Sequence, residues 1–234
     1  MTTIHGYCDS RFQAVADTFA DTFADTFAAN FDERGERGAA FCVTLDGETV
    51  VDLWDGHRTP ADPESIRACA LADLCGYAEP GAWNLPEYLT AEIPSSNGIA
   101  NARALAGLYR AVVHDRALGG HKLSAYDVIR MGAVRSATSV DRFFGSPSRW
   151  ALGFAKATPP GDSSQLTLRL SESAFGHQGM GGSYGFGDPA CRMSMGYVMN
   201  RMHAGPALTP AGALADAVYQ SLGHERHDSL WVAP

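Results

Sequence analysis

The chain has 234 residues, of which 45% are hydrophobic and 19% are charged. A chain of this length buries enough apolar surface to fold without a disulfide or metal staple, and its composition excludes extensive disorder. Eighteen Lys and Arg residues against 26 Asp and Glu residues give a net charge of −8. That balance argues against a nucleic-acid partner and against an anionic membrane surface.

The cysteines and the N-terminus favour a reducing compartment. The five cysteines form no Cys-x-x-Cys pair, and an odd number fits poorly with a disulfide framework. The first ten residues lack the basic and apolar regions of a signal peptide, and no run of about 18 apolar residues is present. We therefore expect a cytoplasmic protein without a membrane span.

The first elements along the chain are a helix and a hairpin. Apolar residues recur at three- and four-residue steps from Phe12 to Phe31, which predicts a helix over 10–34, with Ala-Asp-Thr-Phe occurring three times in it. Two alternating apolar segments, 39–45 and 48–54, flank Asp-Gly. Because Asp-Gly suits a type I′ turn, these segments predict a β-hairpin.

The middle of the chain reads as a connector followed by helices. Residues 57–82 have weak periodicity and many Gly and Pro residues, which is typical of an irregular connector with at most one short helix, at 65–74. Apolar periodicity then predicts helices over 101–114 and over 124–134, the second capped by Ser124.

The last third alternates strands and ends in a helix. We expect strands at 150–154 and 174–180, a second hairpin from 183 to 200 around an Asp-Pro turn, and a closing helix over 209–222. This order predicts an α+β fold: one domain over 1–234, in which an antiparallel β-sheet is flanked by N- and C-terminal helices on one face.

Several segments carry a resemblance to a known family. Phe-Gly-His-Gln-Gly-Met-Gly-Gly occupies 175–182, Arg-Trp-Ala-Leu-Gly-Phe occupies 149–154, and Ala-Glu-Ile-Pro-Ser-Ser-Asn-Gly occupies 91–98. In this order they resemble the serine β-lactamase-like family, which includes class C β-lactamase-related esterases and penicillin-binding-protein-like enzymes. The resemblance covers most of the chain and implies a β-lactamase-like sheet domain.

The resemblance also implies site residues. Such enzymes acylate the serine of a Ser-x-x-Lys turn, helped by a Tyr-x-Asn/Ser element and by a Lys/His-Thr/Ser-Gly strand. It assigns His177, Gln178 and Gly179 to the strand element, and the Met180 N–H to the oxyanion hole. Gln178 departs from the family pattern, because an amide forms hydrogen bonds but cannot relay a proton as a hydroxyl can.

The nucleophile element is absent from the sequence. The chain has only two lysines, Lys122 and Lys156, and a glycine stands three residues before each. The single Tyr-x-Ser, at 219–221, follows His177 and so lies in the wrong order. The resemblance implies that the connector replaces the nucleophile-bearing helical subdomain, which is largely missing. We therefore predict a truncated serine-hydrolase relative, of an ancestral ester- or amide-hydrolysing class, with weak or no turnover.

Two alternatives stay open. Gly-Gly-Ser-Tyr-Gly at 181–185 matches the nucleophile-elbow pattern, so Ser183 is a candidate esterase nucleophile, although an elbow needs a strand before it and a helix after it. Its candidate triad partners are Asp188 or Asp216 with His203, His224 or His227. The other alternative is a non-enzymatic binding or self-associating protein, because loss of the helical layer uncovers sheet surface that the connector or a second copy must cover.

The sequence predicts no metal and no cofactor. His224 and His227 have helical-type spacing for a metal site, but no third ligand accompanies them. The expected partners are a small-molecule ester or lactam and, for self-association, a second copy in a homodimer. No nucleic acid and no membrane are expected.

Overall fold

The computed structural model describes residues 4–20, 38–56, 85–94, 98–158, 169–200, 209–228 and 230–234. The predicted connector 57–82 and its short helix lie outside these ranges, as does the second half of the predicted N-terminal helix. His203 also lies outside them.

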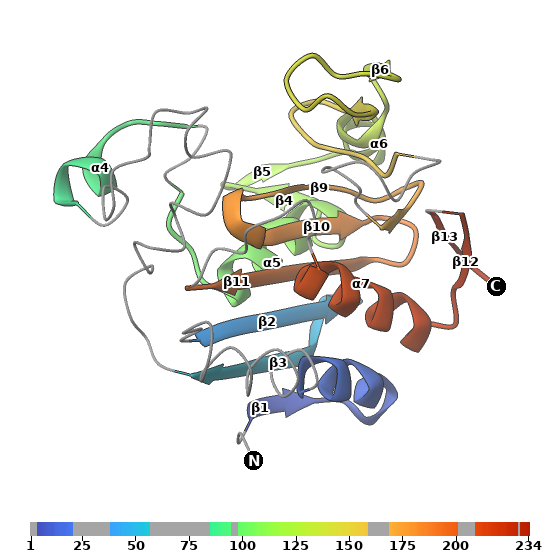
Figure 1. Cartoon of the computed structure of the whole chain (residues 1–234). Coiled ribbons are helices and arrows are strands. Elements are labelled where there is room, and N and C mark those ends of the chain that lie inside the picture. Colours follow the sequence, from blue (N-terminus) through green and yellow to red (C-terminus); the bar gives the residue numbers. More distant parts are fainter. Residues whose placement is uncertain are drawn as a thin grey trace.

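A six-stranded antiparallel sheet forms the centre of the described structure, in the order β1-β3-β2-β11-β10-β9 (Figure 1). Its strands are β1 (His5–Cys8), β3 (Glu48–Gly56), β2 (Gly38–Leu45), β11 (Met193–Met199), β10 (Tyr184–Asp188) and β9 (Phe175–Gln178). The predicted α+β class with an antiparallel sheet is therefore confirmed.

Smaller elements surround this sheet. The helices are η1 (Ser10–Phe12), α4 (Pro86–Thr90), α5 (Ala102–Val113), α6 (Ala125–Gly132), η3 (Met180–Gly182) and α7 (Thr209–Ser221). A three-stranded sheet contains β12 (Glu225–His227), β13 (Leu230–Val232) and β8 (Leu170–Ser171). Two strand pairs complete the set: β4 (Ala117–Leu118) with β5 (His121–Lys122), and β6 (Ser136–Thr138) with β7 (Ser148–Trp150).

Both predicted hairpins form. In the first, β2 pairs with β3, and the two residues between them, Asp46 and Gly47, both have positive φ angles of 50° and 84°. Positive φ at both central positions is the type I′ geometry that Asp-Gly favours. The second hairpin joins β10 to β11 in an unbroken register from Tyr184–Tyr197 to Asp188–Met193.

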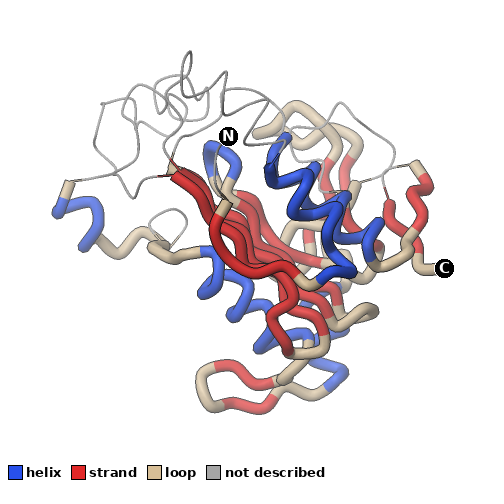
Figure 2. Tube along the Cα trace, turned by 90° about the horizontal axis from the view of Figure 1, so that it is seen from below, coloured by secondary structure: helices blue, strands red, loops and turns tan. Residues whose placement is uncertain are grey.

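The N-terminal and C-terminal helices cover the same face of the sheet, as predicted. Residues 13–20 are helical, and Phe12, Val15 and Phe19 join the main core together with one side of α7. That core also contains the inward side chains of β2, β3, β10 and β11. Figure 2 shows α7 and the N-terminal helix on one side of the sheet and α5 on the other.

Helix α5 packs on the opposite face against β2, β10 and β11. It begins after Asn101, whose side chain caps the Ala104 N–H, and His114 is its C-cap. The helix lies close to the sheet because glycines face it. A Cβ at Gly196 would stand 2.4 Å from the Ala102 carbonyl oxygen, and one at Gly185 would stand 2.7 Å from the Leu105 side chain.

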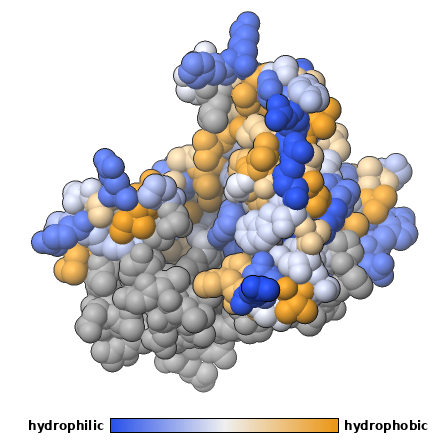
Figure 3. All heavy atoms as spheres, turned by 90° about the horizontal axis from the view of Figure 1, so that it is seen from above, coloured by the Kyte–Doolittle hydropathy of each residue, from blue (hydrophilic) through white to orange (hydrophobic). Residues whose placement is uncertain are grey.

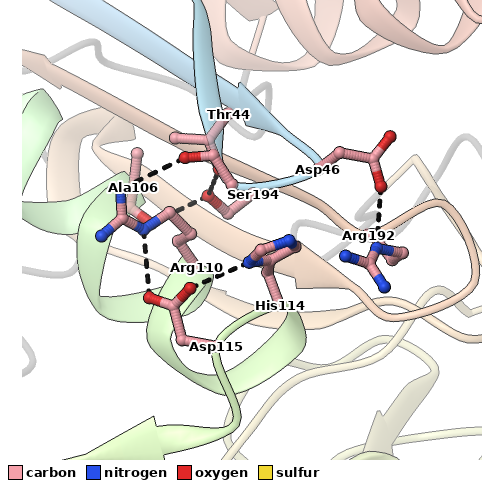
Figure 4. Close-up of polar contacts among 9 residues, drawn as sticks. Thr44, Asp46, Ala106, Arg110, His114, Asp115, Arg192 and Ser194 are labelled. Carbon is pink, nitrogen blue, oxygen red and sulfur yellow. Dashed lines mark hydrogen bonds and ion pairs between the residues drawn. The ribbon is translucent and has the colours of Figure 1, made fainter.

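A buried pair of hydroxyls ties α5 to the sheet (Figure 4). Ser194 donates its hydroxyl to the Ala106 carbonyl over 2.8 Å, and its oxygen lies 2.7 Å from the Thr44 hydroxyl. Because the Ser194 proton is used on the helix, Thr44 must donate in the shared bond. Both side chains are buried, and both are satisfied.

Helix α6 follows the capping box formed by Ser124 and Asp127, so the predicted cap is confirmed. Its exposed face carries apolar side chains, and more exposed hydrophobic side chains follow along 134–152. Figure 3 views the molecule from the side on which α6 and β6 lie in Figure 1, and hydrophobic residues interrupt the polar surface there.

Two predicted strands have different bounds. The strand expected at 150–154 is β7, which ends at Trp150. The chain turns after it, because Gly153 adopts a positive φ of 76° and the Ala151 N–H donates to the carbonyl of Phe154, three residues later. The strand expected at 174–180 is β9, which ends at Gln178 because the chain turns into η3.

Candidate functional site

The site that the resemblance implies lies on β9, the last strand of the sheet. β9 pairs with β10 on its inner side. On its outer side Ala155 exchanges two backbone hydrogen bonds with Gly176, of 2.7 Å and 3.2 Å. The strand is therefore held from both sides at Gly176, while His177 and Gln178 follow at its open end.

His177 and Gln178 point to opposite faces of the sheet. Successive side chains alternate along a strand, and Phe175, two residues before His177, packs in the cluster on the α5 side. Gln178 lies directly opposite Tyr184 on β10, and Tyr184 belongs to the core on the α7 side. The adjacent residues of the predicted element thus serve two different surfaces.

His177 is exposed and lies beside a row of aromatic rings. Its ring centroid is 5.6 Å from that of Trp150, Trp150 is 6.3 Å from Phe144, and Phe144 is 4.8 Å from Phe143. The His177 Nδ1 atom lies 2.6 Å from the Gln178 carbonyl oxygen, which orients the ring. The row gives the open end of β9 an aromatic wall.

Tyr109 supports β9 from helix α5. Burial raises the pKa of Tyr109 to about 12, and a hydrogen bond with the His177 backbone offsets part of that rise. Its phenol is therefore neutral at pH 7, and its hydrogen bond with the His177 backbone ties α5 to β9.

Gln178 and Tyr184 carry buried polar atoms that have no hydrogen-bond partner in the described part of the chain. The Gln178 Oε1 atom and the Tyr184 hydroxyl form no hydrogen bond to any described residue. Tyr184 is fully buried, and burial raises its pKa well above its ordinary value. Sequence reasoning missed Tyr184, although its position directly opposite Gln178 follows from extending the second hairpin to β9.

A tight turn follows the strand. The Gly179 N–H donates to the Ser183 carbonyl over 2.7 Å, and the Gly182 N–H donates to the Gly179 carbonyl over 3.2 Å. Gly181 adopts a φ of 82°, a conformation that favours glycine. Met180 therefore begins a turn whose two ends are fixed by backbone hydrogen bonds.

Ser183 lacks the geometry of a nucleophile elbow. It follows the short helix η3 and precedes the strand β10, which is the reverse of the strand-turn-helix order. Its φ and ψ of −59° and 148° are ordinary extended values, whereas an elbow is a strained turn. Ser183 as a nucleophile stays a prediction.

Among the candidate triad partners of Ser183 that the structure describes, Asp188 and Asp216 are engaged elsewhere, whereas the buried Nδ1 atom of His224 has no hydrogen-bond partner among the described residues. Asp216 accepts from Arg169 and from the Trp231 indole N–H. His224 packs on Tyr219, and exposed His227 lies 3.9 Å from Glu225. His224 precedes β12 and His227 is its last residue, so the two histidines are not on one helix and lack the shared helix face that their spacing suggested. The described residues contain no cluster of three metal-ligating side chains.

The other candidate, Asp188, is the centre of a buried network. Its carboxylate accepts from the hydroxyls of Ser171, Ser173 and Tyr219 at 2.6 Å, 2.5 Å and 2.8 Å, and from the Ala190 N–H at 3.0 Å. Burial alone would raise the pKa of Asp188, but the hydroxyl donors outweigh it and hold that pKa below its ordinary value. The group is structural.

Neither lysine stands beside a serine in the way the family's mechanism needs. Lys156 is 3% exposed, and its Nζ atom donates to the Glu172 carbonyl over 2.5 Å. Burial lowers the pKa of Lys156, and the nearby Glu172 carboxylate partly restores it. Lys122 is exposed on β5.

A second histidine–carboxylate pair lies at the C-terminal end of α5. His114 Nδ1 is 2.8 Å from Asp115, as drawn in Figure 4. Ser194 lies in the same region of the picture, but its hydroxyl bonds to Thr44 and Ala106 and is fully buried. This pair therefore lacks an accessible nucleophile among its described neighbours.

Comparison with solved structures defines the fold class. A penicillin-binding protein homologue from Caulobacter crescentus superposes with a TM-score of 0.70 at 20% identity, covering 94% of this chain and 100% of that chain. A family VIII carboxylesterase gives 0.60 at 19% identity, with the same coverages. EstA from Arthrobacter nitroguajacolicus Rue61a gives 0.62 at 14% identity, covering 92% and 97%. At these identities the likeness establishes a β-lactamase-like fold.

The family follows from the sequence comparison. The model of the Beta-lactamase family matches residues 58–219, more than half of the chain, and the chain therefore belongs to that family. It is 34% identical over 116 residues to "Esterase/beta-lactamase LipL" from Mycobacterium tuberculosis (strain ATCC 25618 / H37Rv). That match covers 49% of this chain and only 25% of the relative's length. The resemblance to a β-lactamase-like family is confirmed.

No helix within the described ranges combines the length and apolar character needed to cross a lipid bilayer.

Proposed function

We propose that this chain is a β-lactamase-related protein that retains the sheet wall of a serine-hydrolase site and lacks the acylating half. It binds small esters or lactams weakly and turns them over slowly or not at all. The observation that supports the proposal is the number and placement of the lysines. The sequence holds two lysines, neither follows a serine by three residues, and the buried Lys156 amine is committed to the Glu172 carbonyl.

The remaining wall offers binding groups without a nucleophile. By resemblance, the turn that begins at Met180 corresponds to the position where relatives hold an oxyanion, and the tilted pair of His177 and Trp150 rings gives an aromatic surface at the end of β9 that precedes this turn. Binding without attack stabilises the ground state only, and an interaction that does not strengthen in the transition state gives no rate enhancement. The proposal therefore separates ligand affinity from turnover.

Turnover is tested with a chromogenic β-lactam and a p-nitrophenyl ester, followed by intact-protein mass spectrometry. We expect hydrolysis at the rate of heat-denatured protein and no acyl adduct. Stoichiometric acylation of any serine would falsify the proposal. Ser183→Ala is the matched variant: it leaves the background rate unchanged if the chain is inactive, and it abolishes turnover if Ser183 is an esterase nucleophile.

Binding is tested separately by intrinsic fluorescence. A nitrophenyl ester bound beside His177 lies near Trp150 and quenches its emission. We expect saturable quenching that is largely lost in Trp150→Phe and retained in Trp54→Phe, because Trp54 lies on β3, remote from β9 in the strand order. Equal loss of quenching in both variants would show that the ester does not bind beside β9.

We also propose a reducing, cytoplasmic setting. Cys8, Cys42 and Cys191 are free thiols, and burial raises the pKa of Cys42 to about 11. Thiols kept protonated in this way are poorly reactive, which fits structural rather than redox roles.

A further inference from the structure

Positive charge is concentrated in one part of the chain. Residues 116–152 contain six Lys and Arg residues against two Asp residues, a net charge of +4, whereas the whole chain carries −8. The backbone of this segment is described throughout, from the β4–β5 pair through α6 to the β6–β7 pair. The overall charge, which argues against an anionic partner, therefore conceals a basic region.

The two carboxylates of this segment are engaged locally, while most of its cations face solvent. Asp127 closes the capping box of α6, and Asp141 accepts hydrogen bonds from two backbone N–H groups and one hydroxyl of its own loop. Arg149 pairs with Glu172. The other five cations are exposed, and none of them forms an ion pair with a described residue: Arg116, Lys122, Arg130, Arg135 and Arg142.

Helix α6 turns an apolar face to solvent. Val128 belongs to a buried core cluster and Met131 packs against it, so this side of the helix faces inward. Tyr126 and Ile129 lie on the opposite side and are 66% and 68% exposed. The Cζ atom of Arg130 lies 5.6 Å from the centroid of the Tyr126 ring, so a cation accompanies these apolar side chains.

Exposed apolar side chains continue on the neighbouring elements. The Leu152 N–H donates to the Met131 carbonyl over 3.3 Å, so exposed Leu152 lies beside the end of α6. Val140 and Phe143 are exposed in the loop between β6 and β7, and α6 and β6 lie together at the top of Figure 1. Figure 3 looks onto this side, where hydrophilic and hydrophobic residues adjoin. The α6 surface consists of Tyr126, Ile129, Arg130, Arg135, Val140, Arg142, Phe143 and Leu152.

We propose that the α6 surface docks this protein on a lipid bilayer that contains anionic phospholipid. The exposed cations attract the lipid phosphates at short range, within about one Debye length. The apolar side chains enter the boundary between headgroups and acyl chains, as those of interfacial proteins do. The rest of the chain carries −12 against the segment's +4, so the same field that attracts the α6 surface repels the remainder and orients the molecule.

The exposed side chains favour a lipid surface over a nucleic acid or another protein. Nucleic acids bind aromatic side chains by base stacking, but Ile129, Val140 and Leu152 offer them no stacking surface. Lipid removes such side chains from water. These residues also lie on separate elements, namely a helix, a loop and the turn after β7. A deformable bilayer accommodates that arrangement, whereas a protein partner needs a complementary shape.

Vesicle co-sedimentation with the full chain tests the docking. We expect binding to vesicles of equal parts phosphatidylglycerol and phosphatidylcholine, far weaker binding to pure phosphatidylcholine, and release by salt. A single-stranded oligonucleotide at matched phosphate concentration should not compete. Failure to bind the anionic vesicles, equal binding to neutral ones, or displacement by the oligonucleotide overturns the proposal. Pelleting without vesicles would indicate self-association and overturns it too.

Matched substitutions test whether the α6 surface is responsible. Arg135→Gln should lower the partition coefficient about fivefold, whereas Arg226→Gln removes an equal charge from exposed β12 and should leave it unchanged. Ile129→Ser should lower it about tenfold, and Ile99→Ser, at a similarly exposed side chain outside the segment, should not. All four side chains are exposed, so circular dichroism should be unaltered. Equal effects of a variant and its control overturn the assignment.

Insertion is read by tryptophan fluorescence. In Ile129→Trp we expect the added emission to shift to the blue on anionic vesicles and to be quenched by brominated acyl chains, because a side chain in the headgroup boundary leaves water. Ile99→Trp, measured in parallel against the wild type, should show neither change. Binding to anionic vesicles without the blue shift in Ile129→Trp overturns the insertion of α6. None of these measurements depends on turnover, so they stand apart from the proposed function.

Discussion

Buried polar groups are fully hydrogen-bonded at one end of β10 and lack described partners at the other end. At its last residue, Asp188 accepts four hydrogen bonds from Ser171, Ser173, Ala190 and Tyr219. At its first residue, the Tyr184 hydroxyl has no described partner, and neither does the side-chain Oε1 atom of Gln178, the residue opposite it. The five residues of β10 thus run from a fully hydrogen-bonded network at Asp188 to two polar atoms without described hydrogen-bond partners, on Tyr184 and Gln178.

This difference in hydrogen bonding distinguishes a part of the molecule that stabilises the fold from a part that is a candidate for binding. A fully bonded buried carboxylate contributes stability and fixes the chain around it, whereas an unpaired buried hydroxyl costs free energy. Orphaned polar atoms in a native structure accompany functional positions, where a ligand or water completes them. The proposed site wall on β9 lies at the end with the unpartnered atoms, so we expect substitutions at the two ends to act differently.

The largest expected effect is at the satisfied end. Asp188→Asn replaces an anion with an amide that also brings two donors, so at least one hydroxyl loses its acceptor. The buried Lys156 also loses a nearby countercharge. We expect unfolding free energy to fall by about 3 kcal/mol in urea denaturation. A loss below about 1 kcal/mol would show that the network contributes little.

The pH dependence should follow the same group. The pKa of Asp188 is lower in the folded protein than its unfolded value of about 3.9. Its contribution is therefore fully present above pH ~5 and is lost as pH falls through the folded pKa. We expect the wild type to lose more stability than Asp188→Asn between about pH 6 and acid, by denaturation at each pH. Parallel curves would contradict the assignment.

A pair of tyrosine variants compares the two ends directly. Tyr219→Phe removes a donor to the Asp188 carboxylate, and we expect it to cost about 1.5 kcal/mol. Tyr184→Phe removes a hydroxyl without a described partner, so it should be neutral or stabilising, by at most about 1 kcal/mol. Both rings are fully buried, which makes the pair matched. Equal losses in thermal and urea unfolding would erase the contrast between the ends.

The smallest effect is expected at Gln178. Gln178→Met keeps the length of the side chain and removes the unpartnered Oε1 atom, so we expect unfolding free energy to change by less than about 0.5 kcal/mol. His177→Ala serves as the neighbouring control on the opposite face, where it removes the contact with Trp150. A large loss for Gln178→Met would reveal a partner outside the described residues.

Much of the fold could be predicted because its signals are local. Asp46 and Gly47 specify a turn by their own backbone preferences, and Ser124 caps the helix that begins at the next residue by accepting from the Asp127 N–H. The stripe of Phe12, Val15 and Phe19 predicts the buried face of the N-terminal helix over the described part. Strand bounds near 150–154 were less predictable, since a turn at Gly153 overrides the apolar pattern.

The site was less predictable because it depends on which strands become neighbours. The resemblance assigns 177–179 to the site, but it does not show that the first two side chains of this segment lie on opposite faces of the sheet. The partner of Gln178 is Tyr184, and the ring beside His177 is Trp150, 27 positions earlier in the sequence. Such contacts come from sheet register, which no short window of sequence contains.

The sequence by itself determined that no lysine follows a serine by one helical turn, since two lysines can be checked in full. It also determined the order of hairpins and helices, because turns, helix caps and hydrophobic periodicity depend on residues that are close together in the sequence. Only the tertiary structure decided that Lys156 is buried against the Glu172 carbonyl and that Asp188 is the centre of a buried hydrogen-bond network. Those outcomes depend on burial and on strand pairing, which arise only when distant segments meet.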